Sequence, residues 1–443
     1  MPSVLTPDEA AETLTWPAWQ RIGFRFFFVA FLLEIAPWSW FSVIPGIRWL
    51  VGLWYDGLNR AVHAANACCF HVRETLVPFN GSGDTSYGWA QLWFFLSVAA
   101  IAAVAWSLLD RKRPNYERGL YWLRTTVRFY LASAALSYGI IKLFATQMAF
   151  PALSQLATPL GDLLPMRLSW LFMGYSTPYQ VFAGAMEFVA GMLLLFRPTV
   201  TAGLLLAMGA FLNVAMINLG YDVPVKIFAM KLFFSSVFLL ALDSRRLLGF
   251  LVFNQGGPPT RAWEPRFTQP WQRWAALAVW LFMVWQLLVE PFKDSIAYTK
   301  LLATRSAPGV FGTAIYDVRH FVVGSDTIPA GVADSLRWKD VIFDNAGGGS
   351  IATRDSLFWR RYGRGYFRYK PDTAAKTVAV WRTSFVPGDS VFLFTMRYER
   401  PDTSTIRFHT AIRGDSVHLE LVRMERHFQL AERQFHWLSE YNR

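Results

Sequence analysis

Two oppositely charged side chains inside apolar runs are the residues best suited to chemistry. Lys142 lies in YGIIKLFATQM, and Glu187 lies in YQVFAGAMEFVAGMLLLF. An ionisable group in hydrocarbon costs about 2.5–3.5 kcal/mol on insertion scales, so such groups usually face a helix bundle and have partners. Desolvation favours the neutral form of a lysine, which would let Lys142 act as a base or a hydrogen-bond donor. The structural alternative is that Lys142 snorkels to the membrane surface while Glu187 is a packing partner or bonds to Asn213.

Further polar side chains are expected at the same depth. At 1.5 Å of rise per residue, Lys142 lies roughly 8 Å and Glu187 roughly 13 Å below the outer ends of their helices. We predict a polar pocket that opens to the outer side and binds a quinone or lipid headgroup, or moves a proton. Glu34 and Glu290 are interpreted as interface or packing positions. The other predicted ligand-binding residues are Asn213, Asn218, Tyr221, Asp222, Lys226 and Lys231.

Long apolar helices must position these residues. Of the 443 residues, 53% are hydrophobic and 17% are charged, against about 25% charged residues in soluble domains. The apolar runs continue to about Phe292 and then stop. Each run is close to the ~20 residues that cross a bilayer. We therefore predict a polytopic α-helical membrane protein with seven spans, at 22–41, 88–109, 126–147, 178–196, 199–218, 226–243 and 274–292.

The distribution of the net charge of +12 predicts the orientation and argues against a nucleic-acid partner. Basic residues cluster between spans two and three and between spans six and seven, which is the positive-inside pattern. The N-terminus is then cytoplasmic, and the tail lies in the periplasm of a bacterial inner-membrane protein. No cleaved signal peptide is evident. Segments 42–86 and 159–180 are expected on the outer side, each with a helix on the membrane surface or, for 159–180, dipping into it.

The tail, residues 293–443, has a different pattern. MRYERPDTSTIRFHTAIRGDSVHLELVRM contains three alternating runs separated by PDTS and RGDS turns, which is typical of an antiparallel meander. LRWKDVIFD, GSIATRD, YFRYK and KTVAVWRT are further candidate strands. We predict an all-β soluble domain, a β-sandwich or barrel of about 6–8 strands. The ending FQLAERQFHWLSEYNR is expected to form a short helix or a covering segment.

Metal, thiol and nucleotide chemistry is poorly supported. The seven histidines lack HxxxH or HExxH spacing, and Cys68 and Cys69 are adjacent. Adjacent cysteines rarely bridge, and they are not a CxxC pair. NAGGGS, at 345–350, fits neither a Walker loop nor a dinucleotide-binding fingerprint. We predict no metal, and the cofactor stays open, with a quinone as one candidate.

One pattern carries a family resemblance. The order is Y-G-x-x-K-L at the end of one helix, then F-x-G-x-x-E-x-x-x-G-x-x-L-L-F in the next, formed by Tyr138, Gly139, Lys142, Leu143, Phe182, Gly184, Glu187, Gly191 and Phe196. Over residues 126–243 the chain resembles the DoxX-like superfamily of four-helix bacterial membrane proteins. The resemblance implies a membrane partner of quinone-coupled or thiol-protecting oxidoreductases.

A more distant likeness is to the membrane part of vitamin K-dependent γ-carboxylases. It implies that Lys142 acts as a base on a quinol. Two features depart from that family. Leu143 stands where the family has the second lysine of its pair, and a smaller β-rich tail replaces the large luminal domain.

Together these patterns divide the chain into four parts: N-terminal helices with an outer amphipathic segment (1–125), a DoxX-like four-helix core (126–243), a loop and last span (244–292), and a periplasmic β-rich domain (293–443). The leading hypothesis is an accessory membrane subunit of a redox or quinone-linked system. It would contact membrane lipids and a periplasmic or membrane redox protein. The alternatives are a quinol- or lipid-modifying enzyme with Lys142 as base, and a structural or assembly protein without a ligand.

Overall fold

The computed structural model describes residues 15–256, 263, 265, 267–305, 309–330, 336–358, 360–383, 390–433 and 435–438. These residues form two compact units. The helical unit comprises the chain up to Gln147 together with Pro178–Ser295, and the barrel unit comprises Met148–Thr177 together with the chain from Ile296. Arg261 and Arg266, two of the basic residues between the sixth and seventh predicted spans, lie outside the described residues.

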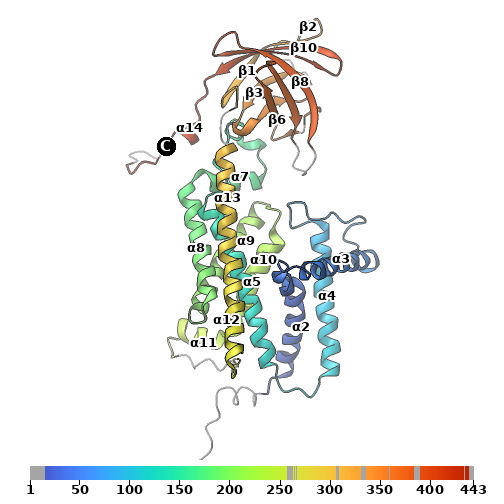
Figure 1. Ribbon diagram of the computed structural model, residues 1–443, viewed down its shortest axis with the longest axis vertical. Coiled ribbons are helices and arrows are strands. Elements are labelled where there is room, and N and C mark those ends of the chain that lie inside the picture. Colours follow the sequence, from blue (N-terminus) through green and yellow to red (C-terminus); the bar gives the residue numbers. More distant parts are fainter. Residues whose placement is uncertain are drawn as a thin grey trace, which may run out of the picture. The chain divides into compact units, whose positions relative to one another are not determined.

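The helical unit is built around one long central helix (Figure 1). In this helix, α5, the side chains of Val127, Leu131, Leu136 and Ile140 are fully buried. The helices are α2 (Ala18–Ile35), α3 (Ile47–Ala65), α4 (Ser86–Leu109), α5 (Glu117–Leu143), α8 (Thr177–Leu195), α9 (Val200–Gly220), α10 (Lys226–Ala241), α11 (Ser244–Leu251), α12 (Pro270–Val284) and α13 (Glu290–Arg305), of which α13 belongs to this unit only up to Ser295. Short helical turns lie at η1 (Pro37–Phe41), η2 (Asn66–Phe70), η4 (Arg197–Thr199) and η5 (Trp285–Val289).

Several of these helices are long and apolar enough to cross a membrane. By length and composition five segments qualify: Ala18–Phe41, Ser86–Leu109, Thr177–Leu195, Arg197–Gly220 and Pro270–Thr304. A sixth is added if α10 and α11, which meet at a bend of 82°, are counted as one span. The predicted span 126–147 falls largely on α5, which is less apolar because it carries Arg124, Arg128 and Lys142. The predicted count of seven therefore stays a prediction.

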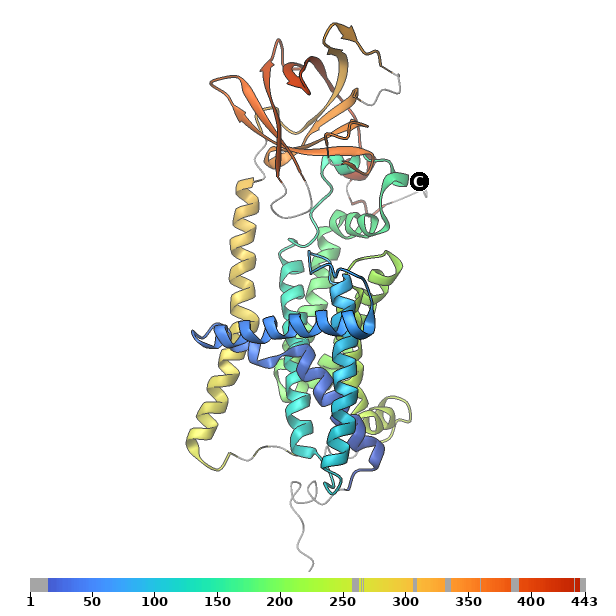
Figure 2. The same ribbon diagram turned by 90° about the vertical axis from the view of Figure 1, so that its right-hand side faces the viewer.

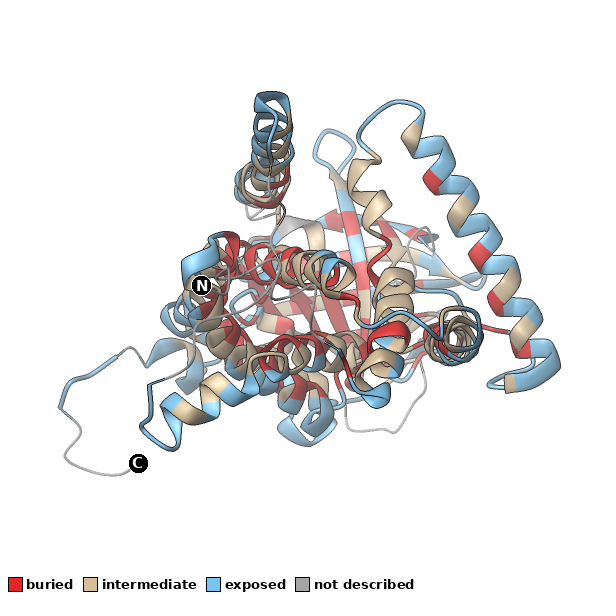
Figure 3. Ribbon diagram, turned by 90° about the horizontal axis from the view of Figure 1, so that it is seen from below, coloured by how far each residue is buried: buried red, intermediate tan, exposed pale blue. Residues whose placement is uncertain are grey.

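Burial follows the pattern expected of a bundle that contacts lipid. Buried positions gather where helices lie against one another, while the outward faces are mostly intermediate or exposed (Figure 3). On α4 the exposed residues include Trp93, Ile101, Val104 and Leu109. This helix therefore presents a large apolar surface of the kind that membrane lipid covers. α3 runs across the long axis of α2 and α4 (Figure 2). It buries only Val51, Leu58 and Val62, as an amphipathic helix does.

The barrel unit contains a closed antiparallel β-barrel. The strands are β1 (Ala314–Val323), β2 (Asp326–Thr327), β3 (Trp338–Phe343), β4 (Gly348–Thr353), β5 (Arg360–Arg361), β6 (Arg364–Asp372), β7 (Thr377–Arg382), β8 (Val391–Glu399), β9 (Thr405–Ile412) and β10 (Asp415–Met424). Among the described residues, eight of them form the ring β10-β9-β8-β7-β6-β4-β3-β1, which closes where β1 pairs with β10. The barrel alternative of the prediction is therefore confirmed, and the sandwich alternative is wrong, because one continuous sheet closes on itself.

The barrel interior is packed with side chains. Trp338, Phe343, Phe367 and Phe408 are among its buried aromatic residues, and the residual cavity between them is about 10 Å³. That is at the lower end of the roughly 10–15 Å³ that one water molecule needs by this measure. Between these described side chains the barrel interior therefore has no room for a ligand.

The segment between α5 and α8 belongs to the barrel unit, whereas the sequence placed it within the helical core. It forms α6 (Leu153–Leu156), η3 (Leu160–Asp162) and α7 (Pro165–Tyr175). Ser154 attaches it to the barrel. Its backbone N–H donates to Asp344 Oδ1 over 3.2 Å and its hydroxyl to Asp344 Oδ2 over 2.5 Å. The Ser350 hydroxyl donates to Ser154 Oγ over 2.6 Å and accepts from Arg364 Nε over 2.7 Å.

Ser154→Ala is expected to loosen this attachment. The substitution leaves the carboxylate of Asp344 and the hydroxyl of Ser350 short of partners in a site where both serines are buried. Such a loss costs about 1–3 kcal/mol. Hydrogen exchange of peptides covering residues 153–158 and 342–351 should therefore accelerate about tenfold or more. Ser325→Ala, at an exposed turn of the same barrel, is the control. Equal exchange in the two variants would contradict the role of Ser154.

Candidate functional site

The Lys142 and Glu187 side chains form an ion pair between α5 and α8. Lys142 Nζ lies 2.5 Å from Glu187 Oε1 and 2.6 Å from Oε2. The two residues are only 6% and 4% exposed. The predicted pairing is confirmed, and snorkelling of Lys142 to the surface is wrong. Two buried charges that neutralise each other remove much of the cost of placing either one in an apolar bundle.

Small residues allow the two helices to approach at this point. A Cβ atom on Gly184 would lie 2.6 Å from Lys142 Cβ and 2.9 Å from the Gly139 carbonyl oxygen. A Cβ on Gly139 would lie 2.6 Å from the backbone nitrogen of Phe188. Glycine is therefore required at both positions. The close approach places the short carboxylate of Glu187 within reach of Lys142, so four residues of the sequence pattern meet at one helix crossing.

One of the three N–H donors of the Lys142 ammonium group remains for an acceptor other than Glu187. An ammonium has three N–H donors, and the two oxygens of Glu187 take two of them. On another side the Tyr138 ring centroid lies 5.8 Å from Nζ, and the Tyr138 side chain is 37% exposed. In this arrangement Lys142 is a donor. It could act as a base only after leaving Glu187.

Lys226, at the start of α10, forms part of a separate polar cluster. Its Nζ lies 2.7 Å from Asp222 Oδ1 and 3.7 Å from Asp84 Oδ2. The carboxylate of Asp84 also accepts the backbone N–H groups of Lys226 and Ile227, over 2.8 and 2.9 Å. Asp84 thus caps α10 from a loop far away in the sequence. Asp84 was not among the predicted site residues, although an aspartate in a loop near the predicted outer face could have indicated a helix cap.

Lys231 has a different partner again. Its Nζ lies 2.7 Å from Glu34 Oε2, which joins α10 to α2. Glu34, interpreted from sequence as an interface or packing position, is therefore half of an ion pair. Asn218 is buried, and its Nδ2 donates to the Val225 carbonyl over 3.3 Å, which stabilises the turn between α9 and α10. Asn213, Tyr221 and Asp222 are exposed. The charged members of the predicted pocket thus belong to three separate ion-pair groups.

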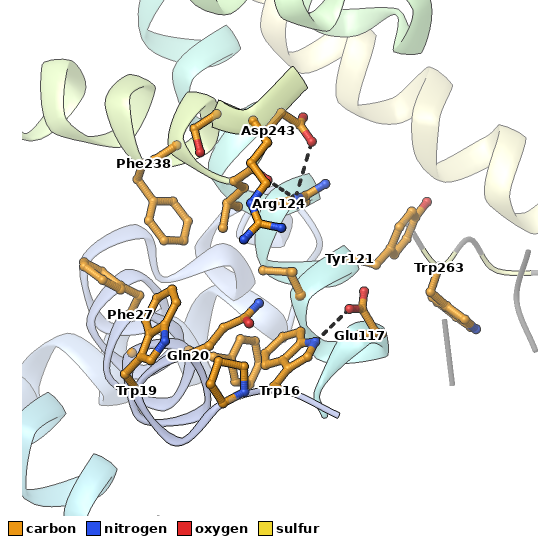
Figure 4. Close-up of a pocket in the computed structure, with 18 of the residues that line it drawn as sticks. Trp16, Trp19, Gln20, Phe27, Glu117, Tyr121, Arg124, Phe238, Asp243 and Trp263 are labelled. Atoms are coloured by element: carbon orange, nitrogen blue, oxygen red, sulfur yellow. Dashed lines mark hydrogen bonds and ion pairs between the residues drawn. The ribbon is translucent and has the colours of Figure 1, made fainter. Parts of the chain in front are cut away.

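Two large cavities open elsewhere in the helical unit, and none of the eight predicted site residues lines either of them. The first, of about 750 Å³, lies between α2, the start of α5 and the end of α10 (Figure 4). In it Trp16 Nε1 donates to Glu117 Oε1 over 2.9 Å. Arg124 Nη2 lies 3.8 Å from Asp243 Oδ1 and donates to the Leu242 carbonyl over 3.4 Å. Glu117 and the Nη2 of Arg124 therefore have partners, while the buried Arg124 Nε has no hydrogen-bond partner among the described residues.

The second cavity, of about 840 Å³, lies between α5 and α12 and is called the α5–α12 groove below. It shares Tyr121 and Trp263 with the first cavity.

Within the part of the chain that the structure describes, no group of three or more His, Cys, Asp or Glu side chains is arranged to hold a metal ion. Cys68 and Cys69 are exposed free thiols.

Comparisons with known proteins add one relative. No family model matches the chain, and no solved structure matches it. Among curated proteins, an uncharacterized protein of Bacillus subtilis (strain 168), YwoB, is 29% identical over 130 residues. The aligned region covers 29% of this chain and 81% of that protein. This chain is therefore similar over 29% of its length to a smaller bacterial protein whose name gives no activity.

Proposed function

We propose that the protein is a non-catalytic membrane subunit of a redox or quinone-linked system, and that its helical unit binds a quinone beside Lys142. One observation carries the proposal. The residues that make the chain resemble DoxX-like proteins meet at the α5–α8 crossing, where Lys142 and Glu187 are buried as a pair with one N–H donor left over.

The ligand class follows from the charge of this site. A paired lysine and glutamate have no net charge, so they would not attract an anionic headgroup strongly. The remaining N–H of Lys142 suits a neutral carbonyl oxygen, which is the acceptor that a quinone offers. Tyr138 stands beside Nζ with a half-exposed ring. An aromatic ring next to the donor can stack on the quinone ring.

The enzyme alternative receives less support. A base must carry a free lone pair near its substrate, and Lys142 donates to both oxygens of Glu187 instead. A non-catalytic role does not require Lys142 to separate from Glu187. We further propose that the barrel docks a periplasmic or membrane redox protein on its outer surface, because its interior is filled.

Mass spectrometry of quinones and lipids that co-purify in native nanodiscs tests the proposal. The wild type is expected to retain about one quinone per chain. Tyr138→Ala, which leaves the ion pair intact, and Glu187→Gln, which breaks it, should both lose it. Glu34→Gln is the matched control, since it breaks the Lys231 pair in the same unit. Circular dichroism and monodispersity of each variant check the fold.

The outcomes separate the hypotheses. A wild type without any specific quinone would overturn the proposal and leave the structural or assembly role. A quinone that survives both Tyr138→Ala and Glu187→Gln would move its site away from Lys142. Turnover of a quinol by the wild type that is lost in Lys142→Met while binding is retained would favour the enzyme instead.

A further inference from the structure

The α5–α12 groove has walls suited to a lipid. Its volume of about 840 Å³ lies in the range of about 300–1,000 Å³ found for small-molecule sites. Its lining is mostly apolar and rich in indole rings, which favour the boundary between lipid tails and headgroups. Every lining residue belongs to the helical unit. The aromatic members are Trp40, Phe41, Tyr121, Trp122, Phe129, Trp263, Phe267, Trp271 and Trp280.

Two arginines give the groove a positive charge. Arg128 comes from α5, and Arg197 comes from the turn η4 between α8 and α9. Arg197 Nη2 donates to the Tyr121 hydroxyl over 2.7 Å, which holds its guanidinium at the groove wall. No carboxylate is among the lining residues that the structure describes. The groove therefore offers fixed positive charge in apolar surroundings, where electrostatic attraction is strong.

Arg128 carries an unsatisfied donor. Its Nε is buried and has no hydrogen-bond partner, while its guanidinium carbon lies 5.1 Å from the centre of the Phe129 ring. A buried donor of a charged group is costly to leave without an acceptor. The unsatisfied Arg128 Nε is an observation independent of the volume of the groove. It favours an anionic oxygen as a ligand atom beside Arg128.

We propose that the α5–α12 groove binds one phospholipid with an anionic headgroup, whose phosphate accepts hydrogen bonds from Arg128 and Arg197. Arginine and phosphate form charge-assisted, often bidentate hydrogen bonds. Basic pockets between membrane helices are suited to anionic headgroups. The acyl chains would lie along the apolar wall that α12 contributes through Ala276, Val279 and Met283.

This site is separate from the proposed quinone site. Arg128 and Lys142 are 14 residues apart on α5, roughly 21 Å along the helix axis at 1.5 Å per residue. The lipid proposal does not depend on the quinone. Loss of the lipid in an Arg128 variant that still retains its quinone would show the two sites to be independent.

Lipid retention and lipid-dependent stabilisation of the full-length protein test the proposal. Purified protein is delipidated in detergent and then titrated with phosphatidylglycerol, phosphatidylcholine or inorganic phosphate, with thermal unfolding and native mass spectrometry as readouts. The wild type should bind one phosphatidylglycerol at least tenfold more tightly than phosphatidylcholine. Arg128→Gln and Arg197→Gln should each weaken phosphatidylglycerol binding about tenfold or more. Arg124→Gln, on the same helix but lining the other cavity, should bind it as the wild type does.

Each other outcome overturns the proposal. Equal affinity for the two lipids would mean that the headgroup charge is not recognised. Unchanged phosphatidylglycerol binding in both Arg128→Gln and Arg197→Gln would place the lipid elsewhere. Stabilisation by inorganic phosphate that phosphatidylglycerol cannot displace would assign the groove to a free anion. Arg128→Lys keeps the charge and removes the fork of donors, so it should bind phosphatidylglycerol more weakly than the wild type. Affinity equal to that of the wild type would contradict recognition through the guanidinium donors.

Discussion

Glu187→Gln is expected to destabilise the helical unit by about 3–5 kcal/mol, the cost of leaving one member of a buried ion pair without its partner. Lys142 would lose its charged partner in a site where it is 6% exposed. Unfolding by sodium dodecyl sulfate in mixed micelles, followed by circular dichroism, measures the change. The large effect reflects burial, because an exposed pair is worth only about 0–1 kcal/mol.

Two further variants make this result decisive. Glu34→Gln removes the partner of Lys231, but both of those side chains are about one-fifth exposed, so its effect should be clearly smaller. The double variant Lys142→Met, Glu187→Leu should regain most of the lost stability, since apolar replacement of a whole buried pair is often neutral or stabilising. An effect of Glu187→Gln as small as that of Glu34→Gln would contradict the buried pair as the main contact at this crossing.

Gly184→Ala is expected to cost about 1–3 kcal/mol through overpacking. The added Cβ would stand 2.6 Å from Lys142 Cβ and 2.9 Å from the Gly139 carbonyl oxygen. The second contact is with backbone, so α5 and α8 must separate. The same unfolding measurement applies. The effects of Gly184→Ala and Glu187→Gln should be less than additive, because each variant disrupts the same crossing.

The chain offers a matched control for this substitution. Gly209 lies in the interior of α9, and a Cβ atom added to it would meet no other atom within 4 Å. Gly209→Ala should be neutral or stabilise by up to about 1 kcal/mol, since glycine inside a helix is unfavourable relative to alanine. If both variants behaved alike, helix propensity and not packing would explain the result, and the close approach at Gly184 would carry no special role.

The two proposed sites divide the chemistry of the helical unit between them. Near the end of α5, Lys142 and Glu187 form a neutral site that suits a carbonyl ligand. Fourteen residues earlier on the same helix, Arg128 faces a groove whose described lining has positive charge and no carboxylate. A quinone and an anionic lipid therefore need different residues, and single substitutions can remove one without the other.

Most helices and strands could be predicted from local sequence patterns. Apolar runs of about 20 residues predicted the long helices, and alternating residues predicted strands that the structure forms as β3, β4 and β6–β10. The pairing of Lys142 with Glu187 was also predictable, because helical rise places two charges at similar depth and burial demands a partner.

Contacts between segments far apart in the chain could not be predicted in the same way. β1 was missed because a register shift between Val318 and His320 interrupts its alternation, yet its pairing with β10 closes the barrel. The ion pair of Glu34 with Lys231, the cap of Asp84 on α10 and the attachment of Ser154 to Asp344 likewise join residues far apart in the chain. Periodicity records the environment of each side chain over a few residues, whereas partners across the fold depend on how whole elements pack. For that reason the charged pair could be predicted from the sequence, whereas the α5–α12 groove was found only in the structure.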